Sequence, residues 1–294
     1  MLESSKQKNY AAVGLVALQK AYAKQLELLD NGAINTIVET NSQGDKAMAG
    51  DIESENVVIA YLREQNFPCR IVGEESGTTE IGSPRYLVVL DGIDGSSGLR
   101  ANPESRCGTI IAIAPNLNPR YNEFIFAGIT EFATNRIVYA IQGKGAYLLQ
   151  AESLRRIIRQ PHHGQLRIEI DNPEFWPDYA EEMGANLGDV FTLTKETFSD
   201  KLRGKFLIKG VASSGAMCID LMLGEADIIG GVIAKGVFEP PAEYLLVHEI
   251  GGVLTDMSGN DIGSGYWLAY GRPLSPLIRA VSPDIAEKFL RLLS

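Results

Sequence analysis

Five apolar, β-branched segments follow one another between residues 69 and 149, and no helical pattern separates them. Each segment is short and bounded by Gly, Pro or Asn, which is typical of strands joined by turns. Strands joined by short connections pair mainly as antiparallel hairpins. The segments are CRIVGEES, YLVVLDGID, GTIIAIAP, EFIFAGIT and RIVYAIQGKGAYLL. We therefore expect an antiparallel sheet in the first half of the chain.

Helical patterns flank this strand-rich region. Apolar residues recur at helical spacing over residues 11–30, where Asn31-Gly32 supplies a stop, and a second helix is expected over residues 51–65. In the second half, expected helices at 178–187, 214–225, 241–252 and 282–293 alternate with expected strands at 166–170, 226–232 and 265–270. The buried residues expected in the second helix include Ile52, Val57, Ile59, Ala60 and Leu62. The pattern predicts a layered α+β fold.

A turn-rich segment at residues 143–153 is the best candidate boundary between two halves. We expect an N-terminal α+β half over residues 1–145 and a C-terminal α/β half over residues 146–294. The chain contains no repeat of 20–50 residues and no low-complexity linker, so the two halves are expected to pack tightly.

Composition excludes several classes of partner. Among the 294 residues, 27 Lys and Arg against 37 Asp and Glu give a formal charge of −10, which argues against nucleic acid as the main partner. No apolar run approaches the ~18–20 residues that cross a bilayer, and the N-terminus lacks an apolar signal core. Three widely spaced cysteines favour buried thiols in a reducing compartment. We expect a cytoplasmic protein without a membrane or nucleic-acid partner.

The most informative acids lie in YLVVLDGIDGSSGL, residues 86–99. An apolar strand delivers Asp91 and, three residues later, Asp94, so both carboxylates can turn toward one point. Hard divalent cations such as Mg²⁺ prefer these oxygen ligands, and the following Gly-Ser-Ser-Gly run can present amide groups to an anion. The alternative is a polar turn with two solvated acids.

Two further segments carry acids in similar settings. A strand pattern runs into Glu74 and Glu75, of which one can join a site while the other faces solvent. Glu239 precedes Pro240-Pro241, a favourable helix start at which negative charge is stabilised. Taken singly, the Glu74-Glu75 segment is better explained as a surface loop, and charge complementarity at a helix N-terminus is a strong alternative explanation of Glu239.

Together, the motifs GEE, D-x-I-D-G-S and an acid preceding a helix that ends in E-x-G-G resemble the inositol monophosphatase family. This family lies within the lithium-sensitive, Mg²⁺-dependent phosphatase superfamily that includes fructose-1,6-bisphosphatases. The order of motifs matches over residues 45–256. The resemblance implies an α+β fold built as a layered αβαβα sandwich and a Mg²⁺-dependent phosphomonoesterase. It also implies two or three Mg²⁺ per subunit, a small phosphorylated polyol or sugar as substrate, and a homodimer.

The resemblance also implies a role for individual residues. Metal ligands would be Glu74, Asp91, the carbonyl of Ile93, Asp94 and Glu239, with Asp91 bridging two metals. Phosphate and substrate would be bound by the amides of Gly95 and Ser96, together with Ser97 and Glu239. The catalytic set would comprise Glu74 and the pair of Asp51 and Ser96, which would orient the nucleophilic water. Asp45 and Asp51 match the spacing of two acids in the flexible N-terminal loop of the family.

The sequence departs from the family pattern at several positions. Phe238-Glu239 replaces Trp-Asp, although fructose-1,6-bisphosphatases have Glu at the like position. Gly92 and Gly98 replace Pro and Asn, which predicts a looser loop, and Thr40 stands where a lysine is expected. The substrate therefore remains open between an inositol phosphate, a sugar bisphosphate and a nucleotide 3′-phosphate. A low-activity, metal-binding regulatory protein with the same fold is the alternative from another class.

The remaining polar signals are weak. His248 lies within the expected helix at 241–252 and is assigned a structural role, and the pair His162-His163 is expected in a surface loop. Arg155, Arg156 and Arg159 are expected on a solvated face.

Overall fold

The computed structural model describes residues 9–40, 46–101, 105–159, 166–170, 207–210, 213–230, 238–267 and 277–293. The N-terminal elements are α2 (Asn9–Asp30), β1 (Ile37–Thr40), β2 (Lys46–Met48), α3 (Ala49–Glu64), β3 (Cys69–Gly73), β4 (Gly77–Ile81), β5 (Tyr86–Asp94) and α4 (Ser96–Ala101). They are followed by β6 (Gly108–Ala114), η1 (Tyr121–Glu123), β7 (Phe126–Glu131), β8 (Arg136–Ile141), β9 (Gly145–Gln150) and β10 (Ser153–Arg156). The C-terminal elements are β11 (Arg167–Ile170), β12 (Leu207–Gly210), α7 (Ser214–Leu223), β13 (Ile228–Gly230), α8 (Glu239–Glu249), β14 (Val253–Asp256), η4 (Ile262–Ser264), β15 (Leu277–Ala280) and α9 (Pro283–Leu293).

The larger sheet has eight strands in the order β10-β9-β8-β7-β6-β5-β3-β4. Its consecutive hairpins confirm the antiparallel pairing expected from the sequence, with one correction: β3 and β5 pair in parallel. The reason is that β4, a strand absent from the sequence expectations, folds back along β3 as the edge strand. After β4 the chain crosses to the other side of β3. Strand β5 therefore pairs with β3 on the side away from β4 and runs parallel to it.

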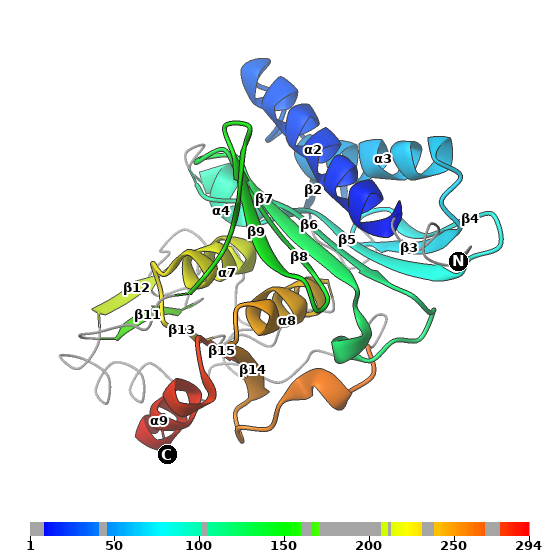
Figure 1. The fold of residues 1–294 in the computed structure, drawn as a ribbon. Helices are drawn as coiled ribbons and strands as arrows, with labels where there is room; N and C mark the ends of the chain where they lie inside the picture. Colours follow the sequence, from blue (N-terminus) through cyan, green and yellow to red (C-terminus); the bar gives the residue numbers. More distant parts are fainter. Residues whose placement is uncertain are drawn as a thin grey trace.

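Helices cover both faces of this sheet (Figure 1). Along β5, Val88 and Leu90 join the apolar cluster that includes α2 and α3, whereas Leu87 and Val89 join the cluster that includes α7 and α8. Alternate strand residues point to opposite faces, so a strand covered on both sides is apolar at every position. This burial explains why YLVVL reads as an uninterrupted apolar run.

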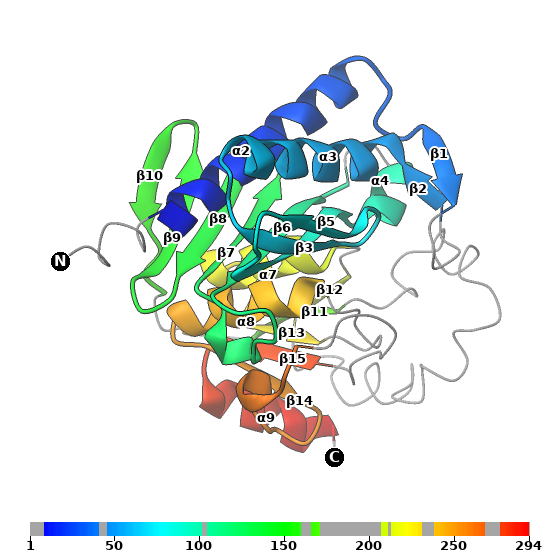
Figure 2. The same cartoon turned by 90° about the vertical axis from the view of Figure 1, so that its right-hand side faces the viewer.

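A second sheet and an outer helix complete the layers. Its five strands run in the order β12-β11-β13-β15-β14, with β11 parallel to β12 and β13. Helix α9 packs on it through Ala286 and Phe289, which contact a cluster that includes Ile168, Ile228 and Ile278. Helices α7 and α8 lie between the two sheets (Figures 1 and 2). The predicted αβαβα sandwich is therefore confirmed.

Other expectations meet the structure unevenly. The expected strands at 166–170 and 226–232 correspond to β11 and β13, whereas β15 was not expected. The expected helix at 178–187 lies outside the described residues, and of the expected strand at 265–270 only 265–267 are described, where Tyr266 forms one bridge with Arg120. The proposed boundary at 145/146 falls at the start of β9, and the eight-stranded sheet continues to Arg156. The two-domain division stays a prediction.

Within the described residues, none of the helices combines the length and apolar character needed to cross a membrane.

Candidate metal and phosphate site

The parallel pairing of β3 and β5 places Glu74 beside Asp91. Gly73 is in register with Leu90, and the amide of Glu74 donates a hydrogen bond of 3.1 Å to the Leu90 carbonyl. Because the carboxyl ends of adjacent parallel strands meet at the same sheet edge, the residue after β3 lies next to the acid near the end of β5. Two acids that are 17 positions apart in the sequence thus arrive at one place.

A β-bulge separates Asp91 from Asp94. Asp91 pairs with Ile110 and Asp94 with Gly108, so β5 carries one residue more than β6 over this stretch. The Gly92 carbonyl accepts hydrogen bonds from Gln25 Nε2 at 3.0 Å and from Thr109 Oγ1 at 2.9 Å. The extra residue shifts the alternation of side chains along β5. The side chains of both acids can therefore point to the same side at the end of the strand.

Gly92 packs closely against the start of α3. A Cβ at this position would lie 2.3 Å from the Asp51 carbonyl oxygen, far inside van der Waals contact. The missing side chain is what lets α3 approach β5, and the looser loop expected from this glycine stays a prediction. The glycine brings Asp51 toward the acids of β5.

The loop after Asp94 enters a short helical turn. Gly95 has a φ of +90°, which favours glycine, and its carbonyl accepts a hydrogen bond of 3.1 Å from the Leu99 amide. Ser96 begins α4 and is half-buried, whereas the side chain of Ser97 lies outside the described residues. Ile93 is buried in a cluster with Ile34, Met48 and Leu99, which fixes the backbone between the two acids.

The charges of the site acids act on one another. Burial raises the pKa of Asp91, and the charges of Glu74, Asp94 and Glu239 raise it further. Burial likewise raises the pKa of Glu74, with Glu239 its strongest charged neighbour. The structure therefore gathers Glu74, Asp91, Asp94 and Glu239 from the end of β3, the end of β5 and the start of α8.

The buried oxygen Asp91 Oδ1 has no hydrogen-bond partner among the described residues. Buried polar atoms are usually paired, and a divalent cation is one partner that carboxylates accept. The described His, Cys, Asp and Glu side chains do not, however, form a ready group of three or more around one point. Like charges repel, which favours separated oxygens among carboxylates that have no compensating cation.

Asp51 lies at the start of α3 beside these acids. Its Oδ2 accepts a hydrogen bond of 3.1 Å from the Met48 amide, and burial, followed by the charges of Glu75 and Glu55, raises the pKa of Asp51 to about 8. The expected pair of Asp51 with Ser96 stays a prediction. Asp45 lies outside the described residues, as do the side chains of Thr40 and Lys46.

Several residues that support the site were missed in the sequence. Glu55 is fully buried on α3, and its carboxylate accepts hydrogen bonds from the Glu75 and Ser76 amides at 3.1 and 2.8 Å. It thereby fixes the turn that carries Glu74. Gln25 on α2 does the same for the bulge, since Nε2 also contacts Ser54 Oγ and Thr109 Oγ1. The helical periodicity of the sequence shows only that each residue is a polar residue on the side of its helix that faces the sheet. It does not indicate a role at the site.

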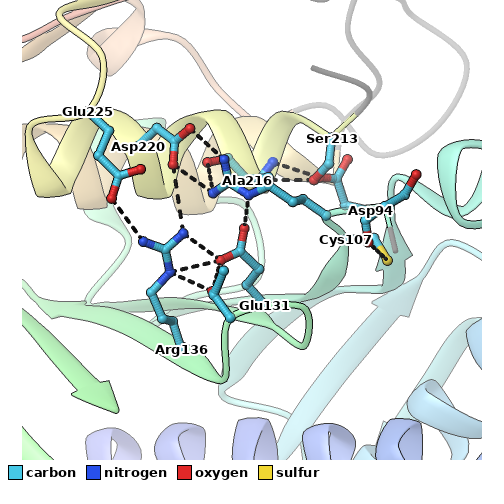
Figure 3. Close-up of polar contacts among 12 residues, drawn as sticks. Asp94, Cys107, Glu131, Arg136, Ser213, Ala216, Asp220 and Glu225 are labelled. Carbon is cyan, nitrogen blue, oxygen red and sulfur yellow. Dashed lines mark hydrogen bonds and ion pairs between the residues drawn. The ribbon is translucent and has the colours of Figure 1, made fainter. Parts of the chain in front are cut away.

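The N-terminus of α7 contacts Asp94 directly. Asp94 Oδ2 accepts hydrogen bonds of 2.6 Å from both the Gly215 amide and Ser213 Oγ (Figure 3). Gly95 is what permits this approach, because a Cβ there would lie 2.7 Å from Ser213 Cβ. The SSGA sequence of residues 213–216, which resembles the small-residue helix of the family but was not expected at the site, therefore belongs to the surroundings of the site.

Glu239 begins α8, as its Pro-Pro sequence predicts, and is half-buried. One turn later, Glu243 is completely buried and ion-pairs with the equally buried Arg279 of β15, while Ser214 Oγ donates to the same carboxylate. These contacts join α8 to α7 and to the second sheet. They fix the helix whose first residue is Glu239.

Other sequence expectations lie away from the site. His248 stacks on Tyr244 and lies 2.9 Å from Asp261 Oδ2, which agrees with a structural role. Arg155 and Arg156 are exposed as expected, but Arg159 is not on a solvated face, because it ion-pairs at 2.6 Å with the buried Asp227. The three cysteines are buried and free, and His162-His163 lie outside the described residues.

Sequence comparisons place the chain near several phosphatases. No protein-family profile matches it. It is 24% identical over 247 residues to a bifunctional NADP phosphatase/NAD kinase of Methanococcus maripaludis and 25% identical over 228 residues to a class 1 fructose-1,6-bisphosphatase of Crocosphaera subtropica. It is also 26% identical over 273 residues to a putative Nus factor SuhB of Neisseria meningitidis. The alignments cover 78%, 72% and 87% of this chain, and 40%, 62% and 88% of the respective relatives. The chain thus spans about half the length of the first two.

Solved structures show the same fold. An inositol monophosphatase–fructose 1,6-bisphosphatase matches with a TM-score of 0.71 at 21% identity, over 96% of this chain and 99% of that one. The extragenic suppressor protein SuhB from Bartonella henselae matches with a TM-score of 0.72 at 16% identity, over 96% and 97%. The predicted resemblance to the inositol monophosphatase and fructose-1,6-bisphosphatase superfamily is confirmed in sequence and in fold.

Proposed function

We propose that this chain is a Mg²⁺-dependent phosphomonoesterase that hydrolyses a small polyol or sugar phosphate, most like an inositol monophosphatase. The single observation that carries the proposal is the gathering of Glu74, Asp94 and Glu239 around the buried Asp91, beside the turn formed by Gly95 and Ser96. The buried oxygen Asp91 Oδ1, which has no hydrogen-bond partner in the part of the chain that the structure describes, supports it, because a bound cation would compensate for the burial of this charge. The names of the relatives add independent support for phosphate-ester chemistry.

The residues divide the work of hydrolysis between them. Glu74, Asp91 and Asp94, with the Ile93 carbonyl and Glu239, would hold two or three Mg²⁺. Bound Mg²⁺ lowers the pKa of water and stabilises charge on the attacking and leaving oxygens of an in-line displacement. The amides of Gly95 and Ser96, with Ser97, would hold phosphate oxygens, and Glu239 would also meet the substrate.

Asp51 and Ser96 would orient the attacking water, alongside Glu74. A carboxyl with a pKa of about 8 accepts and releases a proton near neutral pH, which suits a group that takes a proton from water. Its hydrogen bond from Met48 leaves Asp51 oriented by the start of α3. Water itself would attack the phosphorus, so no covalent phosphoenzyme is expected.

A sugar bisphosphate is the second candidate substrate, which Glu239 and the likeness to a fructose-1,6-bisphosphatase support. Glutamate rather than aspartate at this position, and DGSS rather than the family's usual loop, match the bisphosphatase pattern. A nucleotide phosphate is the third candidate, for which the likeness to an NADP phosphatase/NAD kinase is the support. Lithium inhibition is also expected if the metal site follows the superfamily.

A regulatory protein of low activity is the candidate from another class. The altered third motif, the missing lysine at Thr40 and the likeness to a putative Nus factor favour it. Turnover separates the two classes, because a binding protein would take up Mg²⁺ without releasing phosphate. The proposed partners are otherwise a small phosphate ester and a second copy of the chain.

The proposal is tested by a phosphate-release assay. Substrates are inositol 1-phosphate, fructose 1,6-bisphosphate, 3′-phosphoadenosine 5′-phosphate and NADP, each with Mg²⁺ and with EDTA. We expect release from at least one ester only with Mg²⁺, and a loss of roughly 100-fold or more in Asp94→Asn. Asp284→Asn removes the same charge from an exposed position on α9 and should keep wild-type activity. Unchanged turnover in Asp94→Asn would refute the assignment.

A further inference from the structure

The first turn of α7 holds the carboxylate of Asp94. In addition to the Gly215 amide, Ser213 Oγ donates to Asp94 Oδ2, and the same hydroxyl accepts a hydrogen bond of 3.0 Å from the Ala216 amide as the helix N-cap. Ser213 therefore depends on the helix for its own position. Any shift of α7 moves the two donors that fix this oxygen of Asp94.

Arg106 fastens α7 at two points one turn apart. Its Nη1 and Nη2 donate to Asp220 Oδ2 and Oδ1 at 2.5 and 2.6 Å, and Nη2 also donates to the Ala216 carbonyl at 3.3 Å (Figure 3). Asp220 is completely buried. A planar guanidinium bound to both carboxylate oxygens fixes direction as well as distance. The contacts with Asp220 and Ala216 together restrict both the sliding of α7 along its axis and its rotation about that axis.

Arg106 belongs to the same part of the sheet as Asp94. Asp94 pairs with Gly108, two residues after Arg106, and a Cβ on Gly95 would lie 3.3 Å from the Arg106 carbonyl. The contacts therefore form a closed path. It runs from the start of β6 through Arg106 to α7, from α7 through Ser213 to Asp94, and from Asp94 back to Gly108 of β6. A closed path of hydrogen bonds limits how far Asp94 can move relative to the sheet.

A second arginine, Arg136, contacts the same acids but holds α7 more weakly. Glu131, itself buried, ion-pairs with both Arg106 and Arg136. Arg136 ion-pairs with Glu225 at 3.1 Å and also with Asp220, but only at 3.9 Å and without the two hydrogen bonds that Arg106 donates to that carboxylate. The two arginines thus share the same buried glutamate, but it is Arg106 that donates hydrogen bonds to Asp220 and to the Ala216 carbonyl of α7.

We propose that Arg106 is a positioning residue for Asp94: by fixing α7, it sets the position in which Asp94 meets the metal. The proposal rests on the function proposed above for its claim about the metal, because that function makes Asp94 a ligand. The claim about position rests only on the contacts of Arg106, α7 and Asp94. Residues that orient a metal ligand affect metal affinity strongly even though they do not touch the metal.

The test compares Arg106→Gln with Arg136→Gln in the full chain. Both variants remove a guanidinium from Glu131, so both should lower the melting temperature. Hydrogen exchange of the Gly215 and Ala216 amides is measured without metal, and Mg²⁺ binding is measured by calorimetry with Mg²⁺ alone. In Arg106→Gln we expect exchange at these amides to be at least about tenfold faster and the Mg²⁺ dissociation constant to rise roughly tenfold. In Arg136→Gln both quantities should stay within about twofold of wild type.

Equal exchange in Arg106→Gln and wild type would overturn the proposal, as would an equal change in Arg136→Gln. If wild-type protein binds no Mg²⁺, the metal site of the proposed function is refuted, and the exchange contrast alone decides whether Arg106 positions Asp94. If Arg106→Gln does not fold, Arg106→Lys replaces it. Lysine keeps the charge but lacks the fork that bonds both oxygens of Asp220, so faster exchange is again expected.

Discussion

Asp91 carries its charge where burial and neighbouring acids both oppose it. Its side chain is 3% exposed, its Oδ1 lacks a hydrogen-bond partner among the described residues, and its pKa is raised by burial and then by Glu74. Without a cation, the charged form of this residue destabilises the fold. With a cation, the same residue becomes favourable, because opposite charge compensates for burial.

Replacing Asp91 by Asn should therefore separate stability from function. In EDTA at pH 8 the Asp91→Asn variant is expected to melt above wild type, because one repelling charge is gone. Mg²⁺ should raise its melting temperature less than that of wild type, and phosphate release should fall by roughly 100-fold or more. Thermal melts in EDTA and in Mg²⁺, together with the phosphate assay, measure all three.

Asp284→Asn is the matched control, since it removes one exposed carboxylate from α9. It should respond to Mg²⁺ as wild type does. A melting temperature of Asp91→Asn below that of wild type in EDTA would show that the Asp91 charge does not destabilise the metal-free fold, and would contradict this prediction.

At this scale the sequence identifies the acids but not their supports. Asp91 and Asp94 stand out because two acids follow an apolar strand within a short motif. Gln25, Glu55 and Ser213 do not, because a single polar residue in a helical pattern looks the same whether it faces solvent or a buried carbonyl. The close packing at Gly92 escaped prediction for a related reason: the clash that its Cβ would make with Asp51 comes from a helix 41 positions away in the chain.

A buried ion pair fixes α8, the element that begins with Glu239. Arg279 on β15 and Glu243 on α8 are both completely buried, and Ser214 on α7 donates to the same carboxylate. The three residues come from three different elements of the inner layers. Removal of one partner would leave a buried charge without compensation, which costs far more than the pair contributes.

Arg279→Met is therefore expected to lower the free energy of unfolding by about 3–5 kcal/mol. The double variant Arg279→Met with Glu243→Met should recover at least about 2 kcal/mol of that loss, because no buried charge is left. Urea unfolding of both variants and wild type measures the difference. A loss under about 1 kcal/mol in Arg279→Met would contradict the buried-charge argument.

Among the elements, strong periodic patterns were predictable and pairing was not. The helices at 11–30 and 282–293 and the strands from β5 to β9 follow directly from apolar spacing. The parallel pairing of β3 with β5 escaped prediction, because it depends on the route of the chain past β4. The buried face of α3 was also partly misplaced: Ala60 is exposed and Glu55 is buried, since that face meets the site acids as well as the apolar core.

For the whole molecule, the raised pKa values link stability to pH and to metal. Burial and neighbouring charges raise the pKa of Asp51 from 3.8 to about 8 in the folded chain. A carboxyl with a higher pKa when folded binds its proton more tightly in the folded state. Its contribution to stability is present below the unfolded pKa and is lost as pH rises toward the folded pKa.

The metal-free protein is thus expected to lose stability between about pH 4 and pH 8. Asp51→Asn should make this decline less steep. At pH 8, Mg²⁺ at about 100 times its dissociation constant should raise the wild-type melting temperature by on the order of 5 °C. Thermal melts at several pH values, with EDTA and with Mg²⁺, measure each effect.

Two results would contradict this linkage. One is an Asp51→Asn protein whose melting temperature declines with pH as steeply as that of wild type. The other is the absence of any Mg²⁺ effect on wild type at pH 8. The layered fold itself does not depend on either outcome, because its apolar clusters are stabilised by burial and not by the charges of the site acids.

The most direct test of the account is anomalous diffraction from crystals soaked in Mn²⁺, which replaces Mg²⁺ at oxygen sites. We expect at least one strong peak roughly 2.0–2.3 Å from carboxylate oxygens of Glu74, Asp91 and Asp94, with Glu239 nearby. Peaks confined to surface acids, or four carboxylates with no ion among them, would contradict it.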